Sequence, residues 1–196
     1  KDGLRVTLCA PTGRAARRMT EVTGKKASTI HRLLEFLPED GGFAKNAEDP
    51  LELDVLVVDE SSMVDLPLMY AVLEALPKKA CLLLVGDEDQ LPPVGAGAVL
   101  SDLLATTEVK RGVLTEIFRQ ENGSDIPENA QRVLAGEFPL PAKTGRFHLR
   151  HIEDAKEMIE KMVQMLVIDI PRHLKKDPFE DVQVLTPMRK GPLGCE

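Results

Sequence analysis

The chain has 196 residues, of which 43% are apolar, so it is long and apolar enough to build a folded core and is not a disordered segment. Only 4% of its residues are aromatic and none is Trp, which leaves few rings for a surface that stacks nucleic-acid bases. A net charge of -7 excludes a generally basic nucleic-acid-binding protein.

Apolar runs alternate with helical patterns in the first half of the chain, as is typical of a parallel α/β sheet. The runs predict strands at 4–10, 54–60 and 80–87, and the helical patterns predict helices at 13–24, 28–36, 65–76 and 98–104. Gly24 is expected to end the first helix, Ser28 to cap the second, and Asp65 to cap the third. The continuous apolar run of "ACLLLVGD" predicts that the third strand is buried on both faces.

Residues 37–53 separate the second helix from the second strand. Gly41 and Gly42 beside Asp40 predict a hairpin turn, and an irregular loop remains the alternative. After Gln120 the pattern restarts and predicts helices near 127–136 and at 154–169, and strands near 146–152 and at 181–187. We expect a domain boundary near 118–124.

Two adjacent carboxylates end the second strand in "LVVDESSMVD", residues 56–65. Because successive strand side chains point to opposite faces, Asp59 and Glu60 should point different ways. One can hold a metal ion while the other handles a water: in P-loop nucleotide hydrolases the strand-end Asp holds Mg²⁺ and a following Glu can polarise the attacking water. The alternative is a solvated acidic turn.

The segment after the third strand, "GDEDQLPPVGAG", places Asp87 and Gln90 at the same sheet edge if the strands are parallel. A Gln amide can donate to a γ-phosphate oxygen and accept from the attacking water. Arg119 in "LTEIFRQ" lies at the expected boundary, where it could reach a γ-phosphate as an arginine finger. An interdomain salt bridge is the alternative for Arg119.

A basic segment at 12–32 stands out in this acidic chain, with six Lys or Arg residues and one acidic residue, Glu21. Such a segment can follow a phosphate backbone, or it can be a solvated helix face. Cys9, Cys81 and Cys195 are widely spaced, which favours buried thiols in a reducing compartment and a cytoplasmic location. No apolar stretch approaches the roughly 20 residues of a bilayer span and no signal peptide opens the chain, so we expect no membrane contact. Because the first residue is Lys1, we expect a piece of a longer protein.

Six segments, in order, resemble motifs of superfamily 1 DNA helicases of the RecD family, which includes the alpha subunit of exodeoxyribonuclease V: "APTGRAARRM", "STIHRLL", "VVDESSMVD", "VGDEDQLPPVGAG", "LTEIFRQ" and "VLTPMRKGPLG". The resemblance implies a P-loop NTPase (RecA-like) α/β fold, a parallel sheet with helices on both faces, followed by the start of a second RecA-like domain. Residues 1–120 would form the first motor domain, with 37–53 as a hairpin that splits duplex DNA, and 121–196 would form part of the second.

The resemblance also implies residue roles. Asp59 would bind Mg²⁺ and Glu60 would orient the water, with ATP contacts from Asp59, Asp87, Gln90 and Arg119. Single-stranded DNA would meet two groups of residues, namely Pro11, Thr12, Gly13 and Arg14, and Thr29, His31 and Arg32. A lone His at a helix start is more often a capping or packing residue, which is the alternative for His31.

One departure bears on mechanism, because the phosphate-binding pattern G-x-x-x-x-G-K-[ST] is absent: "TGKKAS" at 23–28 has Lys26 where Ser or Thr should stand. The resemblance implies a 5′ to 3′ ATP-dependent translocase on single-stranded DNA, with room for nuclease or helicase partner subunits, whereas residues 1–196 alone should hydrolyse little ATP. The alternatives are a relaxase-type or other P-loop ATPase and a non-catalytic scaffold of a nuclease complex.

Overall fold

The chain forms two compact units, Lys1–Glu116 and Ile117–Glu196, which are described separately. The structure, a computed structural model, describes residues 3–39, 41–114, 125–141 and 147–195. Within those ranges, no helix combines the length and the apolar character that crossing a bilayer requires.

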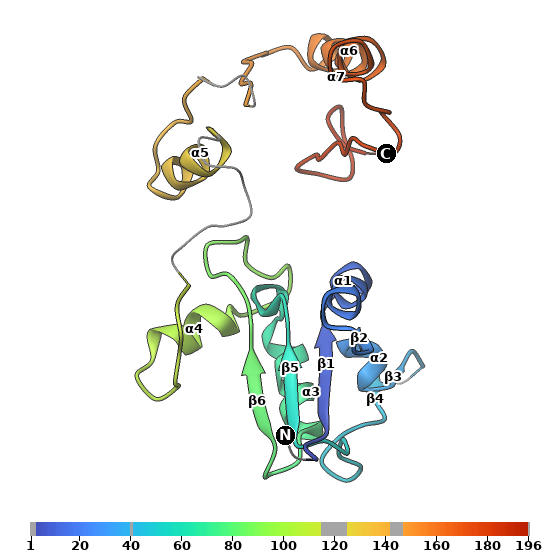
Figure 1. Ribbon diagram of the computed structural model, residues 1–196, viewed down its shortest axis with the longest axis vertical. Coiled ribbons are helices and arrows are strands. Elements are labelled where there is room, and N and C mark those ends of the chain that lie inside the picture. The colour runs from blue at the N-terminus through green and yellow to red at the C-terminus, as the bar shows by residue number, and fades with distance from the viewer. Residues whose placement is uncertain (1–2, 40, 115–124, 142–146, 196) are drawn as a thin grey trace. The chain divides into compact units, whose positions relative to one another are not determined.

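The first unit is built on a sheet of four parallel strands in the order β2–β1–β5–β6 (Figure 1). The three predicted strands are confirmed, each shorter than expected, and a short strand after the first helix is added; the four are β1 (Val6–Ala10), β2 (Ala27–Thr29), β5 (Val55–Val58) and β6 (Cys81–Leu84). In register, Cys9 pairs with Val58, and Val58 with Leu84. The carboxyl ends of these strands therefore lie along one edge of the sheet.

Helix α1 (Gly13–Thr23) ends as predicted at Gly24, which has φ +67° and donates its N–H to the Thr20 carbonyl at 2.9 Å. The left-handed conformation is the reason that glycine suits this position. Thr20 also accepts, at its Oγ1, the N–H of Ala27 at 2.9 Å. This bond ties the start of β2 to the helix before it.

The second helix, predicted at 28–36, is wrong in its start, its end and its cap. Helix α2 is a single turn (Ile30–Leu33), and Thr29 caps it by accepting the Arg32 N–H at 3.2 Å. Ser28 lies instead in β2, paired with Cys9 of β1. Pairing with β1 therefore overrides the local capping preference.

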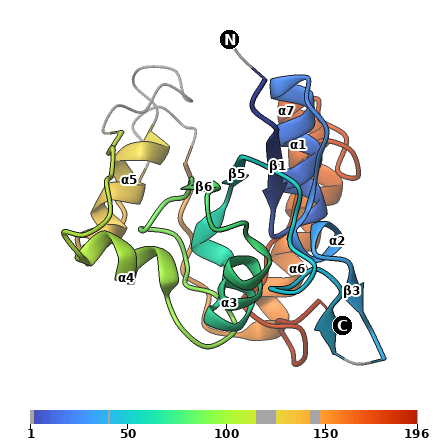
Figure 2. The same ribbon diagram turned by 90° about the horizontal axis from the view of Figure 1, so that it is seen from below.

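A hairpin follows α2, in which β3 (Phe36–Leu37) pairs antiparallel with β4 (Gly42–Phe43). The hairpin extends from beside α2 (Figure 2). The ring centroids of His31, Phe36 and Phe43 lie 5.5 to 5.7 Å apart, so the three rings pack against one another at the hairpin base.

One face of the sheet carries the main core. Asp65 caps α3 (Leu66–Ala75) as predicted, accepting the Leu68 N–H at 2.9 Å, and α4 (Val99–Ala105) follows β6 later in the chain. The core joins residues of β1, β5, α2, α3 and α4 with flanking loops: Cys9, Ile30, Leu34, Leu51, Leu53, Leu56, Val58, Val64, Met69, Val72, Ala75 and Val99. The register places Leu82 and Leu84 of β6 on the same face, where they pack against this core.

The opposite face is covered less completely. Ala16 and Met19 of α1 are buried, but Leu83 of β6 is 51% exposed and Cys81 is also exposed. The prediction that this strand is buried on both faces is therefore wrong, because β6 is the edge strand of the described sheet and its Cys81–Leu83 face is left open. For the same reason the prediction of buried thiols holds for Cys9 but fails for Cys81, and Cys195 is exposed as well.

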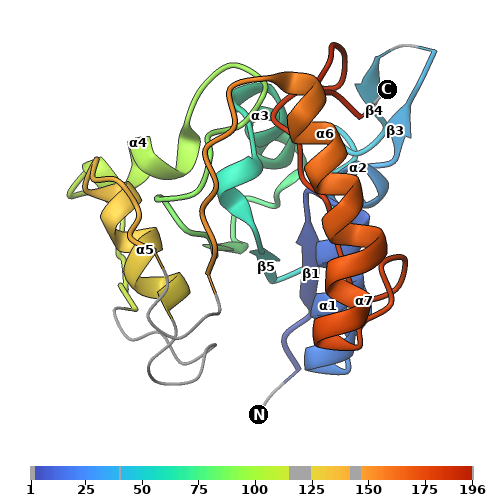
Figure 3. The ribbon, with the colours of Figure 1, turned by 90° about the horizontal axis from the view of Figure 1, so that it is seen from above.

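The regular secondary structure among the described residues of the second unit is helical, and consists of α5 (Asp125–Leu134), α6 (Ala155–Gln164), a π-helical stretch (Met165–Asp169) and α7 (Ile170–Leu174). The last three run on as one long helix (Figure 3), longer than predicted, which Asp154 caps by accepting the Glu157 N–H at 2.8 Å. The strands predicted near 146–152 and at 181–187 are not formed at 147–152 or 181–187. A strand needs a hydrogen-bonded neighbour, and no other strand is present among the described residues of this unit.

Leu56→Ala should destabilise the first unit by about 2 to 5 kcal/mol, because it opens a cavity around a fully buried side chain of the central strand. Leu83→Ala in the neighbouring strand is the matched control and should cost under about 1 kcal/mol, since the side chain is half exposed. Urea unfolding of both variants measures the difference. Equal losses would contradict the assignment of the two sheet faces.

Burial raises the pKa of the Cys9 thiol to about 12 from an ordinary 9.0. Cys9 should therefore resist a thiol reagent at pH 8 in the native protein and react only in denaturant, whereas exposed Cys81 should react at once. Because the folded-state pKa is the higher one, the stabilising contribution of the neutral thiol is present below pH 9 and is lost as the pH rises toward 12. Timed labelling of the wild type and of a Cys81→Ser, Cys195→Ser double variant isolates Cys9, because Cys195 is exposed as well. Fast labelling of Cys9 would contradict its place in the core.

Candidate functional site

The strand order reverses beside β1, and this places two loops together. The chain passes from β1 through α1 to β2 on one side, and β5 then pairs on the other side of β1. In open α/β sheets, ligands bind at the carboxyl ends of the strands at such a switch point. The Asp59 N–H donates to the Cys9 carbonyl at 2.9 Å, so residues 11–13 and 59–60 leave the sheet side by side.

Asp59 is half-buried directly after β5, and its Oδ1 accepts the Glu60 N–H at 3.0 Å. This bond fixes one oxygen and leaves Oδ2 as the available ligand atom. Mg²⁺ at nucleotide sites takes one or two carboxylates and completes its shell with phosphates and water. Within the described ranges no group of three or more His, Cys, Asp or Glu side chains could hold a metal.

Glu60 has left the strand, with φ +52° and ψ +39° in the left-handed region. For a residue other than Gly this conformation costs about 1 kcal/mol or more, and such costs are frequent at functional sites. The strand alternation that predicted opposite directions for Asp59 and Glu60 therefore does not set the direction of the Glu60 side chain. The left-handed turn sets it instead.

Ser61 fixes the turn after Glu60 to the end of β6. Both its N–H and its Oγ donate to the Val85 carbonyl, each at 2.9 Å, and its side chain is fully buried. A Cβ added at Gly86 would lie 2.7 Å from Ser61 Oγ, so the chain passes this turn too closely for a side chain. Sequence reasoning missed Ser61, and the only local signal was a small hydroxyl residue directly after the two carboxylates.

The loop from Gly86 carries Asp87 and Gln90 at the same edge of the sheet as Asp59. Asp87 shapes the loop, since its Oδ1 accepts the Asp89 N–H at 3.1 Å and its carbonyl accepts the Gln90 N–H at 3.3 Å. Gln90 is exposed and lines a cavity of about 240 Å³ together with Ser62, Glu88, Pro92, Pro93, Ala98, Leu100 and Ser101. The loop therefore brings Gln90 next to the turn that follows Glu60.

The far end of this loop returns onto the start of α3. The Leu66 N–H donates to the Ala96 carbonyl at 2.9 Å, and Gly97 adopts φ +92° with no room for a Cβ beside Leu66. A Cβ at Gly95 would overlap the carboxylate of Asp65. Two of the glycines in this loop are thus required by close approach rather than by flexibility.

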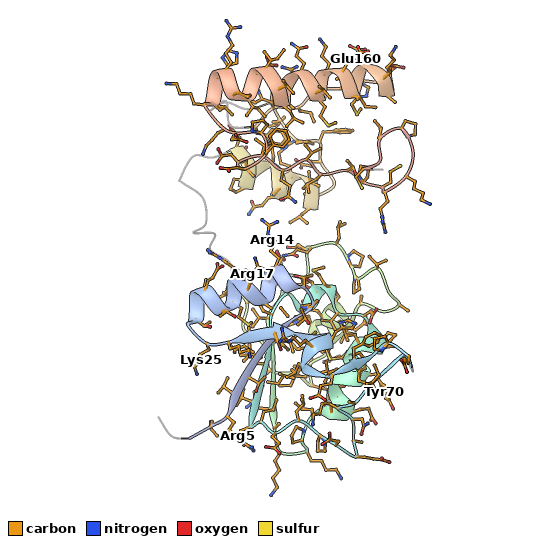
Figure 4. All side chains as sticks on the ribbon, turned by 90° about the vertical axis from the view of Figure 1, so that its right-hand side faces the viewer. Arg5, Arg14, Arg17, Lys25, Tyr70 and Glu160 are labelled. Carbon is orange, nitrogen blue, oxygen red and sulfur yellow. The ribbon has the colours of Figure 1, made fainter. Side chains whose placement is uncertain are left out.

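The residues expected to meet DNA divide into two groups. Pro11, Thr12 and Gly13 form the entry to α1, where Thr12 Oγ1 accepts the Ala15 N–H at 3.2 Å as the helix cap. Arg14 and Arg17 extend from the same side of the helix and are exposed (Figure 4). Helix N-termini favour anions, so this end of α1 can receive a phosphate.

In the second expected group, Thr29 and His31 have structural roles. Thr29 caps α2, and the His31 ring packs against Phe36 and Phe43, which favours the packing role for His31. Arg32 is exposed and its side chain remains available for an anion. Arg119, the expected arginine finger, lies outside the described residues.

The larger cavity of the first unit, about 560 Å³, is elsewhere. It lies between the hairpin, α2 and α3, and its lining includes His31, Phe43 and Tyr70 but none of Asp59, Glu60 or Gln90. Size alone would favour this cavity as the active site. Asp59 and Glu60 line neither cavity, and of the residues expected to act on ATP only Gln90 lines the smaller one.

The chain is similar in sequence to known helicases. Residues 1–96 match the AAA domain family. The chain is 45% identical over 194 residues to the ATP-dependent RecD2 DNA helicase of Deinococcus radiodurans, covering 99% of this chain and 25% of that protein. It is 31% identical over 224 residues to the RecBCD enzyme subunit RecD of Mycolicibacterium smegmatis, covering 100% of this chain and 40% of that protein.

A solved structure of Pif1 helicase from Bacteroides in complex with ADP-AlF3 and ssDNA is similar at a TM-score of 0.46 and 21% identity, over 88% of this chain and 48% of that chain. The chain spans 25% of the length of the RecD2 relative and 40% of the length of the RecD relative. Since the sequence similarity to them runs through nearly the whole of this chain, the chain belongs to the RecD-like superfamily 1 helicases.

Proposed function

We propose that this chain is part of the ATP-driven motor of a DNA helicase that moves 5′ to 3′ on single-stranded DNA. The observation that carries the proposal is the meeting of Asp59, Glu60 and the α1 entry at the switch point of the sheet, bonded through Asp59 N–H and the Cys9 carbonyl. One edge of the sheet then serves both ATP hydrolysis and the DNA track. The similarity of the chain to an ATP-dependent RecD2 DNA helicase supports this proposal.

In the proposed reaction, Asp59 would hold Mg²⁺, which would supply positive charge against the developing negative charge of the nucleotide phosphates. Glu60 accepts a hydrogen bond from the attacking water and orients it in line with the γ-phosphorus. Gln90 donates its amide to a γ-phosphate oxygen, and Asp87 holds the loop that presents it. Arg119 is the proposed finger that stabilises the developing charge.

Single-stranded DNA is proposed to cross the N-terminal end of α1, with backbone N–H groups near Gly13 and the guanidinium groups of Arg14 and Arg17 meeting phosphates. Arg32 adds a second contact beside β2. Movement of the Gln90 loop on hydrolysis passes to this track through β5 and β1, which are hydrogen-bonded neighbours. The hairpin at 36–43 is proposed to part the duplex ahead of the track.

Partner subunits are part of the proposal, because one relative is named as a subunit of the RecBCD enzyme. A cytoplasmic location stays a prediction of the sequence.

Hydrolysis of ATP by the full-length protein, with and without single-stranded DNA, tests the proposal. DNA should stimulate turnover strongly, and Glu60→Gln should lower kcat by about 10² to 10⁴ because the water loses its orienting base. Glu74→Gln, an exposed carboxylate on α3, should leave kcat within about twofold of the wild type. Residues 1–196 alone should turn over little ATP, since they contain no phosphate-binding loop. A rate of ATP hydrolysis that does not change when DNA is added would reject the proposed helicase function and support only an ATPase.

Arg17→Ala should reduce the salt dependence of single-strand binding. If Arg17 neutralises one phosphate, the slope of log affinity against log salt should become shallower by about 0.7. Lys78→Ala is the control, because Lys78 lies before β6 at the opposite edge of the sheet and should leave the slope unchanged. Fluorescence anisotropy from 50 to about 300 mM salt measures both. An unchanged slope for Arg17→Ala would place the track away from α1.

A further inference from the structure

Ser62 has a buried hydroxyl without a partner. Among the described residues, its Oγ is the buried side-chain polar atom that no hydrogen bond reaches, and the residue is only 8% exposed. Burying a hydroxyl without a partner is unfavourable, because the group loses its hydrogen bonds to water, so folded proteins rarely leave one unpaired. Nothing in the roles assigned above uses this group.

The position of Ser62 suggests what the hydroxyl is for. Ser62 follows Ser61, whose two bonds to the Val85 carbonyl fix the turn against the end of β6. The Ser62 N atom lies 3.0 Å from the place of a Cβ at Gly86, so the Gln90 loop starts directly against it. Ser62 and Gln90 then line the same 240 Å³ cavity. Ser62 thus stands between the turn that carries Glu60 and the loop that carries Gln90.

The cavity lining offers Gln90, Glu88 and Ser101 as polar partners, and Gln90 alone among them carries a donor and an acceptor on separate atoms. A hydroxyl donates one hydrogen bond and accepts others, and a Gln amide does both, so the pair can bond with either group as the donor. The Gln90 side chain is exposed and can turn into the cavity that it already lines. The carboxylate of Glu88 can only accept, and it leaves the acceptor capacity of the hydroxyl unused.

We propose that Ser62 is a positioning residue whose Oγ hydrogen-bonds the Gln90 side-chain amide and so holds Gln90 toward the γ-phosphate. The inference rests on the proposed role of Gln90 and adds the group that sets its orientation. Ser62 itself touches neither nucleotide nor water. Its hydroxyl gains its partner only when Gln90 turns inward, so the bond favours the state in which Gln90 can contact the nucleotide.

A double-mutant cycle in the full-length protein tests this role. Ser62→Ala should lower the DNA-stimulated kcat about tenfold and leave KM for ATP within about twofold, since one hydrogen bond is worth up to about 1.5 kcal/mol. Ser62→Thr, which keeps the hydroxyl, should recover activity to within about threefold of the wild type. In a Gln90→Ala background, Ser62→Ala should have no further effect, because the bond it removes is already absent.

Equal loss on Ser62→Ala in both backgrounds would overturn the proposal, because a purely structural role does not depend on Gln90. Loss that disappears in a Glu88→Ala background instead would also overturn it. If the wild type shows no DNA-stimulated hydrolysis, the proposed function fails, and hydrogen exchange of residues 86–93 then decides the contact. Exchange that is faster in Ser62→Ala than in the wild type, and that returns to the wild-type rate in Ser62→Thr, would support the bond. The same exchange rate in Ser62→Ala and in Ser62→Thr would overturn it.

Discussion

The arrangement of the sheet edge that carries Asp59 and Glu60 depends on the Val85 carbonyl. It accepts two hydrogen bonds from Ser61, and the Val85 N–H in turn donates to the Val58 carbonyl at 2.8 Å. Two strand ends and the turn after Glu60 are therefore locked by adjacent backbone groups. Because the locked groups are mostly backbone, the geometry does not rely on long side chains that water or salt could displace.

These hydrogen bonds separate a held part of the sheet edge from an exposed loop. The β5 side holds Asp59 and the strained Glu60 in fixed positions, while the loop after Gly86 is exposed through Gln90 and is shaped mainly by Asp87. The proposed motor would need this arrangement, in which the backbone of the two carboxylate residues is held while an exposed loop responds to the state of the nucleotide. The α1 entry lies at the same sheet edge, so a shift of the Gln90 loop can be transmitted to it through β1.

Much of this was predictable from the sequence because parallel strands have a strong signature. Continuous apolar runs predicted β1, β5 and β6, and parallel pairing then implied that Asp59 and Gln90 would share an edge. The signature fails where the determinant is not local. Residues 27–29 carry no apolar run, and only the ladder with β1 makes them a strand. Ser61 was not foreseen because its partner, Val85, is 24 residues away. The strands expected after residue 145 were wrong because an apolar run needs a neighbouring strand as well as its own pattern.

Glu60 also has a consequence for attempts to make this protein more robust. Its left-handed backbone is a conformation that glycine adopts freely, so a search for stabilising substitutions would select glycine at position 60. That change would relax the backbone and delete the carboxylate proposed to orient the water. A substitution that raises thermal stability at this residue is therefore expected to lower turnover, and stabilising substitutions should be sought elsewhere in the fold.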